Sequence, residues 1–156
     1  MIIESIEHYR LSRRQVLVLG GTAILALSPL GAEASPKQAK AQLAELTKGA
    51  KLQKGRVNID LPGLTQDGTR TRIKISVDSP MTDQDYVKAL HILAERNTVP
   101  NVATYHFTPR SGVAEIITRI RVAKSQTIIV AAEMSDGSVY YAKARCKVAR
   151  GAGGCG

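Results

Sequence analysis

Aromatic side chains are scarce in this chain of 156 residues, which contains no tryptophan and one phenylalanine. Any hydrophobic core must therefore be built from aliphatic side chains. The same scarcity leaves no platform of rings on which the bases of a single-stranded nucleic acid could stack. The composition therefore predicts no nucleic acid partner.

Cysteine is also rare, since only Cys146 and Cys155 are present. Two cysteines are too few for a disulfide framework, and their spacing matches no metal-binding motif. The sequence also lacks a supported Ser-His-Asp arrangement, a motif of paired carboxylates and a glycine-rich phosphate loop. His91 and His106 stand alone in apolar segments, which is typical of core histidines. These absences predict no metal site and do not favour an enzyme with its own active site.

The N-terminus has the pattern of an export signal. Arg13 and Arg14 directly precede a mostly apolar run over residues 16–30, and a small-residue cleavage pattern follows at residues 32–34. These features are typical of a signal peptide, and paired arginines in this place are read by the twin-arginine pathway. A membrane anchor is the alternative, but it needs about 18 to 20 mostly apolar residues. We expect residues 1–34 to be removed and the mature chain to act in the bacterial periplasm, free of the membrane.

Basic residues outnumber acidic ones, with 22 Lys and Arg against 13 Asp and Glu. Residues 1–34 hold three of each sign, so their removal leaves the net charge at +9. The basic residues are scattered through the chain, which together with the export signal argues against a nucleic acid target. The charge then indicates either a solvated cationic surface or attraction to small anions or an acidic partner.

Hydrophobic spacing divides the mature chain into a helical start and a β-rich remainder. Ser35 and Pro36 are the cap and first-turn residues that helices favour, and apolar residues recur at helical spacing up to Gly49. We therefore predict a short helix and a linker over residues 35–54. From residue 55 onward, apolar and polar residues alternate with period two, which indicates half-buried strands.

Six or seven short strands, mostly antiparallel, are predicted over residues 55–148. Apart from one ambiguous segment, they are expected at residues 57–61, 72–78, 102–107, 114–122, 127–134 and 139–148. The ambiguous segment, residues 82–94, fits either a strand or a helix with a capping box at Thr82 and Asp85, and periodicity alone does not separate the two. This pattern predicts a mainly β fold, a β-sandwich.

The last two strands are predicted to form a hairpin around Asp136 and Gly137, a pair that two-residue type I′ turns favour. This turn pairs Met134 with Val139. One face of the hairpin then carries Cys146 among apolar side chains, so we expect a buried thiol of low reactivity. The opposite face is half apolar and supplies three candidates for a partner surface, Ile128, Val130 and Tyr141. Cover by a loop or by the first helix is the alternative for that face.

Four glycines surround the second cysteine in the last residues of the chain: Gly151, Gly153, Gly154 and Gly156. Glycine leaves the backbone free and chain ends fray unless they are tied down, so we predict a flexible arm over residues 149–156. The seven steps from Val148 to Cys155 span up to roughly 24 Å, enough to carry a thiol into another protein's cleft. A disulfide with Cys146 is the alternative, and it requires the arm to fold back onto an inward-facing position.

Five segments of the mature chain closely resemble the SoxY family, the sulfur carriers of the periplasmic thiosulfate-oxidising system. They are residues 77–88 (VDSPMTDQDYVK), 102–109 (VATYHFTP), 118–126 (TRIRVAKSQ), 132–137 (AEMSDG) and 153–156 (GGCG). The resemblance covers essentially the whole mature chain. It implies an immunoglobulin-like antiparallel β-sandwich with one short N-terminal helix, and it implies a strand over residues 86–94.

The same resemblance implies that Cys155 is the attachment site of inorganic sulfur. In this family a c-type cytochrome, SoxXA, oxidatively joins thiosulfate to the thiol as a cysteine S-thiosulfonate. SoxB then hydrolyses off sulfate, and a sulfane dehydrogenase, in systems that have one, oxidises the remaining sulfur. SoxZ, a second sandwich without its own signal, would be exported bound to this chain. No cofactor is implied other than the bound sulfur intermediates, so the chain would be a carrier and not an enzyme.

Three features depart from the family pattern. The chain ends one glycine earlier than is common, residues 149–152 form a longer and basic link, and Cys146 stands where an apolar residue is expected. A second hypothesis is therefore kept: a non-covalent periplasmic sandwich that binds a partner or an anion and has a structural or dimerising tail cysteine. The two hypotheses differ in whether Cys155 carries sulfur.

Overall fold

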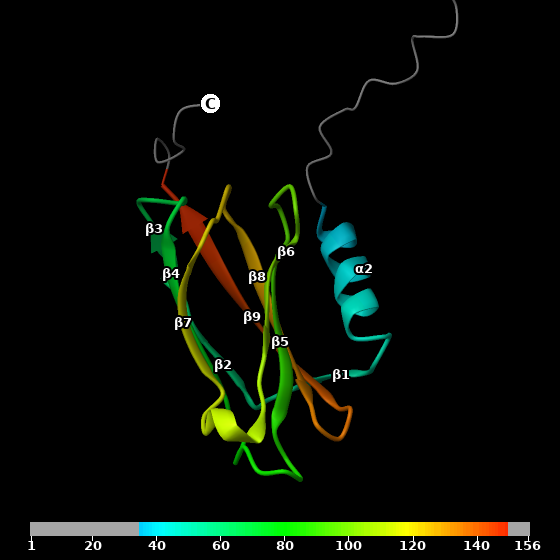
Figure 1. Cartoon of the computed structure of the whole chain (residues 1–156). Helices are drawn as coiled ribbons and strands as arrows, with labels where there is room; N and C mark the ends of the chain where they lie inside the picture. Colours follow the sequence, from blue (N-terminus) through cyan, green and yellow to red (C-terminus); the bar gives the residue numbers. More distant parts are fainter. Residues whose placement is uncertain (1–34, 150–156) are drawn as a thin grey trace, which may run out of the picture. The chain divides into compact units, whose positions relative to one another are not determined.

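The computed structural model describes residues 35–149 of the chain. The predicted export signal, with Arg13 and Arg14, and the predicted arm beyond Ala149 lie outside the described residues. The described part begins with a helix, α2 (Pro36–Leu46), and continues with nine strands and one turn of 3-10 helix, η1 (Pro109–Ser111) (Figure 1). α2 confirms the short N-terminal helix predicted from the sequence.

Two sheets pack face to face. The larger sheet is built from β1 (Leu52–Lys54), β3 (Leu64–Thr65), β5 (Val87–Ala94), β6 (Asn101–His106), β8 (Gln126–Met134) and β9 (Val139–Val148). The smaller sheet is built from β2 (Val57–Asp60), β4 (Thr71–Val77) and β7 (Glu115–Ile120). The strand orders are β1-β9-β8-β5-β6, with β3 also on β9, and β2-β4-β7. Pairing is antiparallel except for β1 and β3, which run parallel to β9. The predicted immunoglobulin-like sandwich is confirmed.

The core between the sheets is aliphatic, as the scarcity of aromatic residues predicted. Ile73 and Ile75 of β4 belong to one buried cluster with Leu90 and Ile92 of β5 and Val130 of β8. Full burial of one such side chain stabilises the fold by about 1.5 to 3 kcal/mol. The alternation of β4 therefore fixes which of its faces carries polar residues, and that face is exposed on the outside of the smaller sheet.

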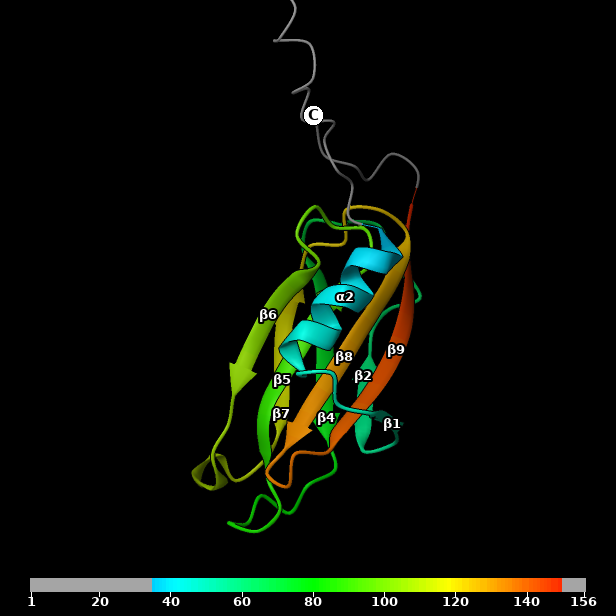
Figure 2. The ribbon, with the colours of Figure 1, turned by 90° about the vertical axis from the view of Figure 1, so that its right-hand side faces the viewer.

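α2 covers the outer face of the larger sheet (Figure 2). Its Leu43 packs in a second buried cluster with residues of that sheet, Leu93, Ile129, Ala131 and Val139. The helix begins at the predicted cap: the Gln38 backbone N–H donates to Ser35 Oγ at 3.3 Å, and the Ser35 N–H donates to Gln38 Oε1 at 2.8 Å. It ends at Leu46 with Thr47 as its C-cap, and the next two residues, Lys48 and Gly49, have positive φ angles of 52° and 73° that turn the chain away from the helix axis.

The hairpin between β8 and β9 differs from the predicted one by one residue of register. The turn is not type I′, because Gly137 alone among its residues has a positive φ, of 84°. Met134 N donates to Ser138 O at 2.9 Å and Gly137 N donates to Met134 O at 3.1 Å. This is the pattern of a three-residue loop in which a type I turn is followed by a left-handed glycine. The extra loop residue pairs Glu133, and not Met134, with Val139.

The shift moves every β8 side chain to the other face, because successive residues of a strand alternate. Ile128 and Val130 are fully buried in the core between the sheets, so the prediction that they form an exposed partner surface is wrong. Tyr141 lies on the outer face of the larger sheet, partly buried against the Leu43 cluster. Cys146 belongs to β9, whose phase was predicted correctly, and it faces the core.

Two strands and one histidine were not predicted correctly. β1 and β3 are short and mostly exposed, so they carry no alternation that a sequence pattern could detect. Residues 82–86 form no helix, although Asp85 N donates to Thr82 Oγ1 at 3.2 Å. The strand that follows, β5, agrees with the strand implied by the family resemblance. His106 is exposed at the end of β6, so the prediction of a core histidine is wrong there.

Candidate functional site

The predicted attachment residue, Cys155, and the arm glycines 151, 153, 154 and 156 lie outside the described residues. The structure does describe where their segment begins, at Val148 and Ala149, which we call the tail root. Val148 N donates to Ser125 Oγ at 2.9 Å, and Ala149 N donates to Thr65 O at 3.0 Å. The end of β9 lies beside β3 and the start of β4 (Figure 1). The root is therefore fixed to the sandwich up to Ala149.

Gly68 allows the loop between β3 and β4 to pack against the tail root. A Cβ atom at this position would lie 2.6 Å from Val122 O and 3.2 Å from Val148 Cγ1. Val122 N also donates to Gly68 O at 2.7 Å. The loop thus packs against the end of β9 through a buried residue that has no side chain.

Cys146, the other thiol of the chain, is fully buried with 0% exposure. It lies in the core cluster between the sheets, and its Sγ has one long contact, 3.6 Å to Lys147 O. Burial raises the pKa of this thiol above its ordinary value. Because the thiolate is the reactive form, Cys146 is poorly suited to carry sulfur. Its burial and low reactivity agree with the prediction from strand phase.

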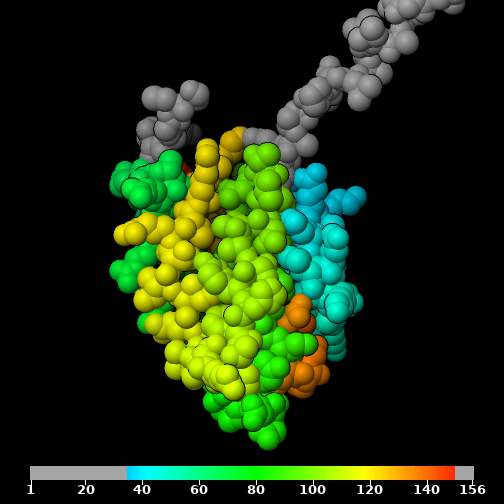
Figure 3. All heavy atoms as spheres, in the orientation of Figure 1, coloured from blue at the N-terminus to red at the C-terminus, as the bar shows by residue number. Residues whose placement is uncertain are grey.

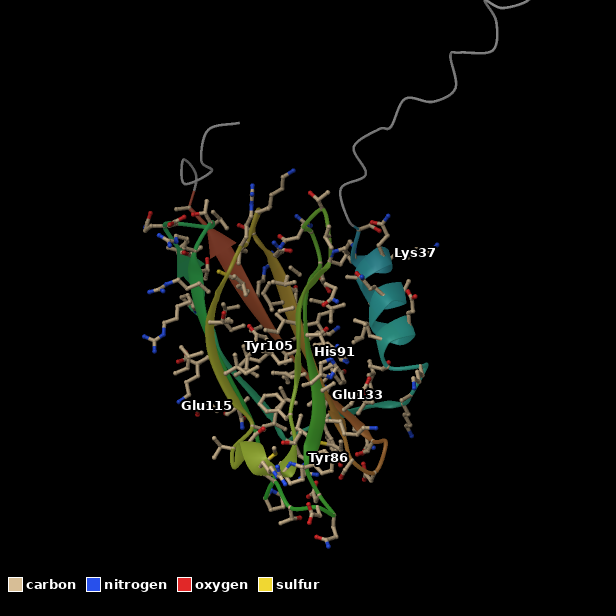
Figure 4. The ribbon with its side chains drawn as sticks, viewed as in Figure 1. Lys37, Tyr86, His91, Tyr105, Glu115 and Glu133 are labelled. Atoms are coloured by element: carbon tan, nitrogen blue, oxygen red, sulfur yellow. The ribbon has the colours of Figure 1, made fainter. Side chains whose placement is uncertain are left out.

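His91 is a satisfied buried histidine, as predicted. It is 4% exposed, and its ring nitrogens lie 3.0 Å from Thr104 Oγ1 and 3.3 Å from Glu133 Oε1. Figure 4 shows His91 and Glu133 close together on the larger sheet. Residues 35–149 contain no group of three or more His, Cys, Asp or Glu side chains placed to hold a metal ion. No helix in this range is long and apolar enough to cross a membrane.

An unpredicted cluster of arginines lies near the tail root, on the outer face of the smaller sheet. Arg72 of β4 and Arg119 of β7 are direct partners in the ladder, and Arg70 follows Gly68 by two residues. With Ile117 they line a hollow in this face. We call Arg70, Arg72 and Arg119 the arginine cluster. The only sequence signal for it is the alternation of basic residues at positions 70, 72 and 74.

The fold and the tail root define an immunoglobulin-like β-sandwich whose last strand leads directly into a short segment that contains a cysteine. The chain belongs to the SoxY family, because the family model described as sulfur oxidation protein SoxY matches residues 43–155. The match covers the sandwich and reaches Cys155. SoxY is a family of sulfur carriers of the Sox system, whose members are generally exported and act with Sox partners such as SoxZ.

Solved structures share this fold. The sulfur carrier protein SoxY from Chlorobium limicola f thiosulfatophilum has a TM-score of 0.63 at 22% identity, over 74% of this chain and 95% of that chain. Superoxide reductase (neelaredoxin) from Ignicoccus hospitalis has a TM-score of 0.55 at 12% identity, over 75% and 95%. Superoxide reductase from Nanoarchaeum equitans gives 0.52 at 11%, over 62% and 98%. These identities support the fold alone. No curated protein matches the sequence.

Proposed function

We propose that this chain is a periplasmic carrier that holds thiosulfate-derived sulfur covalently on Cys155 while partner enzymes act on it. The main support is that the family match extends to Cys155 while the second thiol, Cys146, is fully buried. A buried thiol with a raised pKa cannot compete for a hydrophilic substrate.

The proposed loading step is an oxidation. The Cys155 thiol loses its proton, its sulfur forms a bond to the outer sulfur of thiosulfate, and two electrons pass to the c-type cytochrome SoxXA. The product is cysteine S-thiosulfonate. In the next step, catalysed by SoxB, water breaks the bond between the sulfane sulfur and the sulfonate, which releases sulfate and leaves a persulfide on Cys155. A sulfane dehydrogenase, where one is present, would oxidise that persulfide sulfur.

The described residues contribute position to this chemistry. Hydrogen bonds to Ser125 and Thr65 hold the tail root at one end of the sandwich, so the residues that follow start from a fixed point. Seven steps from Val148 to Cys155 span up to roughly 24 Å. An enzyme can then receive Cys155 in a cleft while the sandwich stays outside it.

The remaining parts of the proposal concern export and assembly. Arg13 and Arg14 before an apolar run support export by the twin-arginine pathway. A heterodimer with SoxZ would cross the membrane as a folded pair, which that pathway accepts. The proposed SoxZ contact excludes Ile128 and Val130, because both side chains are buried in the core.

The proposal is tested by the intact mass of the mature chain purified from cells that oxidise thiosulfate. We expect a reducible sulfur adduct that tryptic peptides assign to Cys155, with none on Cys146. Cells grown without thiosulfate provide the control. A bare Cys155 in both cultures, or a dominant bridge between Cys146 and Cys155, would refute the carrier and favour the non-covalent module.

A further inference from the structure

Two arginines stand next to each other on the outer face of the smaller sheet. Arg72 and Arg119 are direct partners in the antiparallel ladder of β4 and β7, and both are exposed. Like charges directly opposite one another in a sheet are destabilising. This pair therefore costs free energy in the isolated domain, and a negative charge brought from outside would stabilise it.

Two acidic residues lie on the same face, and both are neighbours of Lys74: Asp60 of β2 is its direct partner in the ladder and lines a hollow with Arg72 and Lys74, and Glu115 forms an ion pair with it. Glu115 Oε2 lies 3.1 Å from Lys74 Nζ. Within residues 35–149, neither Arg72 nor Arg119 has a carboxylate within ion-pair distance. Asp60 thus offsets part of the Arg72 charge without an ion pair, and three arginines and Lys74 outnumber the two carboxylates on this face.

Arg70 extends the positive surface toward the tail root. The nearest acidic residue in the sequence, Asp67, accepts hydrogen bonds from Thr69 N at 2.8 Å and from Thr69 Oγ1 at 2.5 Å. These bonds hold the Asp67 carboxylate in the turn. Its charge interacts with that of Arg70 and offsets part of it. The net charge of the arginine cluster stays positive.

An exposed aliphatic side chain accompanies the three arginines. Ile117 of β7 is 53% exposed and lines the same hollow as the arginine cluster. Arginine is enriched in protein interfaces, where charged groups surround a more apolar centre. A small inorganic anion would gain nothing from Ile117, whereas a protein surface would bury it. The composition therefore favours a protein partner.

The cluster lies at the end of the sandwich where the tail begins. Thr71, beside Arg70, pairs with Ile120, and Gly68 packs against Val148 of the tail root. A protein seated on the arginine cluster would be close to the first residues of the segment that carries Cys155.

We propose that Arg70, Arg72, Arg119 and Ile117 form a docking surface for the acidic face of an enzyme that acts on Cys155. This inference rests on the proposed function. Complementary charge raises the rate of productive encounter. Contact at this surface also keeps the tail root beside the enzyme, so that Cys155 enters the cleft without a second diffusive search.

The test compares two mature carriers of equal net charge. In the first, Arg72→Glu and Arg119→Glu reverse the charge of the docking surface. Two like charges still face each other across the ladder, so the stability of the fold should change little. In the control, Lys37→Glu and Lys51→Glu reverse two other exposed residues. Lys37 is on α2, and Figures 3 and 4 show α2 on the side of the sandwich away from β3 and β4. Both carriers are assayed with SoxXA and thiosulfate.

We expect the first variant to lower kcat/KM for the carrier about tenfold at about 20 mM salt, mostly through KM, and the difference to shrink at about 300 mM. The control variant should stay within about twofold of the wild type. Equal values for the two variants would overturn the docking surface and leave the proposed function intact. Failure of the wild-type carrier to be modified on Cys155 would refute the proposed function, and the docking surface with it.

A second measurement separates a protein partner from a small anion. Sulfate and thiosulfate are titrated into the mature carrier while the backbone amide resonances of Arg72 and Arg119 are followed by NMR. We expect only weak shifts that do not saturate at millimolar concentrations. Saturable binding of either anion that is lost in the Arg72→Glu, Arg119→Glu variant would overturn the docking proposal and assign the cluster to a small anion.

Discussion

Gln126 lies directly opposite Cys146 in the ladder of β8 and β9, and both residues are buried. The amide of Gln126 is engaged elsewhere: its Nε2 donates to Asn97 Oδ1 at 2.8 Å, and its Oε1 accepts from Arg96 N at 2.6 Å. The glutamine thus ties β8 to the turn after β5. The Gln126 side chain makes no hydrogen bond to the Cys146 sulfur, which has only its long contact to Lys147 O.

This arrangement predicts that Cys146→Ser lowers the free energy of unfolding by about 1 to 3 kcal/mol, because a hydroxyl would be buried without a good partner. Urea unfolding of the mature chain measures the loss. Cys155→Ser is the control and should leave stability unchanged while abolishing sulfur turnover. Equal losses of stability for both variants would show that the two thiols do not differ as described.

Gly68→Ala should destabilise the domain by about 1 to 3 kcal/mol, because the new methyl group would collide with the Val122 carbonyl. Gly63→Ala provides a matched control, since nothing lies within 4 Å of its Cβ position. Both are compared by urea unfolding. Equal stabilities would mean that the loop does not pack against the tail root as the structure has it.

Arg72→Glu alone should raise the free energy of unfolding by about 0.2 to 1 kcal/mol, because it replaces a like-charge pair with an opposite-charge pair opposite Arg119. The gain should fall in about 0.5 M NaCl, where exposed charges are screened. Thermal unfolding at low and high salt measures it. A loss of stability at low salt would contradict the described pairing.

Asp67 should contribute to stability in a pH-dependent way. Hydrogen bonds from Thr69, and to a smaller degree the charge of Arg70, lower the pKa of this carboxyl from its ordinary value of 3.8. A lowered pKa in the folded state means that the contribution is present above the pKa of the unfolded chain and is lost as pH falls through the folded pKa. At pH 6, Asp67→Asn should therefore have a lower free energy of unfolding than the wild type. Below about pH 4 the wild type loses this contribution, so the difference between the two proteins should become smaller. Carboxyl titration by NMR checks the shift, and a midpoint at or above 3.8 would contradict it.

Much of the sandwich was predictable from alternation. The cap at Ser35, the strands β2, β4 and β7 and the burial of Cys146 all follow from local patterns that agree with the packing. β5 required the family resemblance, because nearly all of its residues are buried. A strand covered on both faces loses its alternation.

The errors have a shared physical cause. Asp136 and Gly137 fit two different turns, and the choice between them changes the register of the hairpin by one residue. That single residue exchanged the two predicted faces of β8, so Ile128 and Val130 were assigned to a partner surface although they lie in the core. Turn geometry depends on backbone angles that the identity of two residues does not determine.

The arginine cluster could not be predicted because its members come from different strands. Arg72 and Arg119 are far apart in the sequence, and the pairing of β4 with β7 brings them together. The alternation of basic residues at positions 70, 72 and 74 indicates one basic strand face, but it does not indicate that Arg119 lies beside it. Pairing between distant strands is decided by packing, which a single sequence does not reveal.

The end of β9 has a mechanical consequence. β9 is paired with β8 over most of its length, and on its other edge β1 pairs with its first residues and β3 with its last. A force applied to the tail along the direction of this strand would load many of these hydrogen bonds together in shear. A partner that binds Cys155 tightly would therefore transmit force to the carrier without separating β9 from the sheet one hydrogen bond at a time.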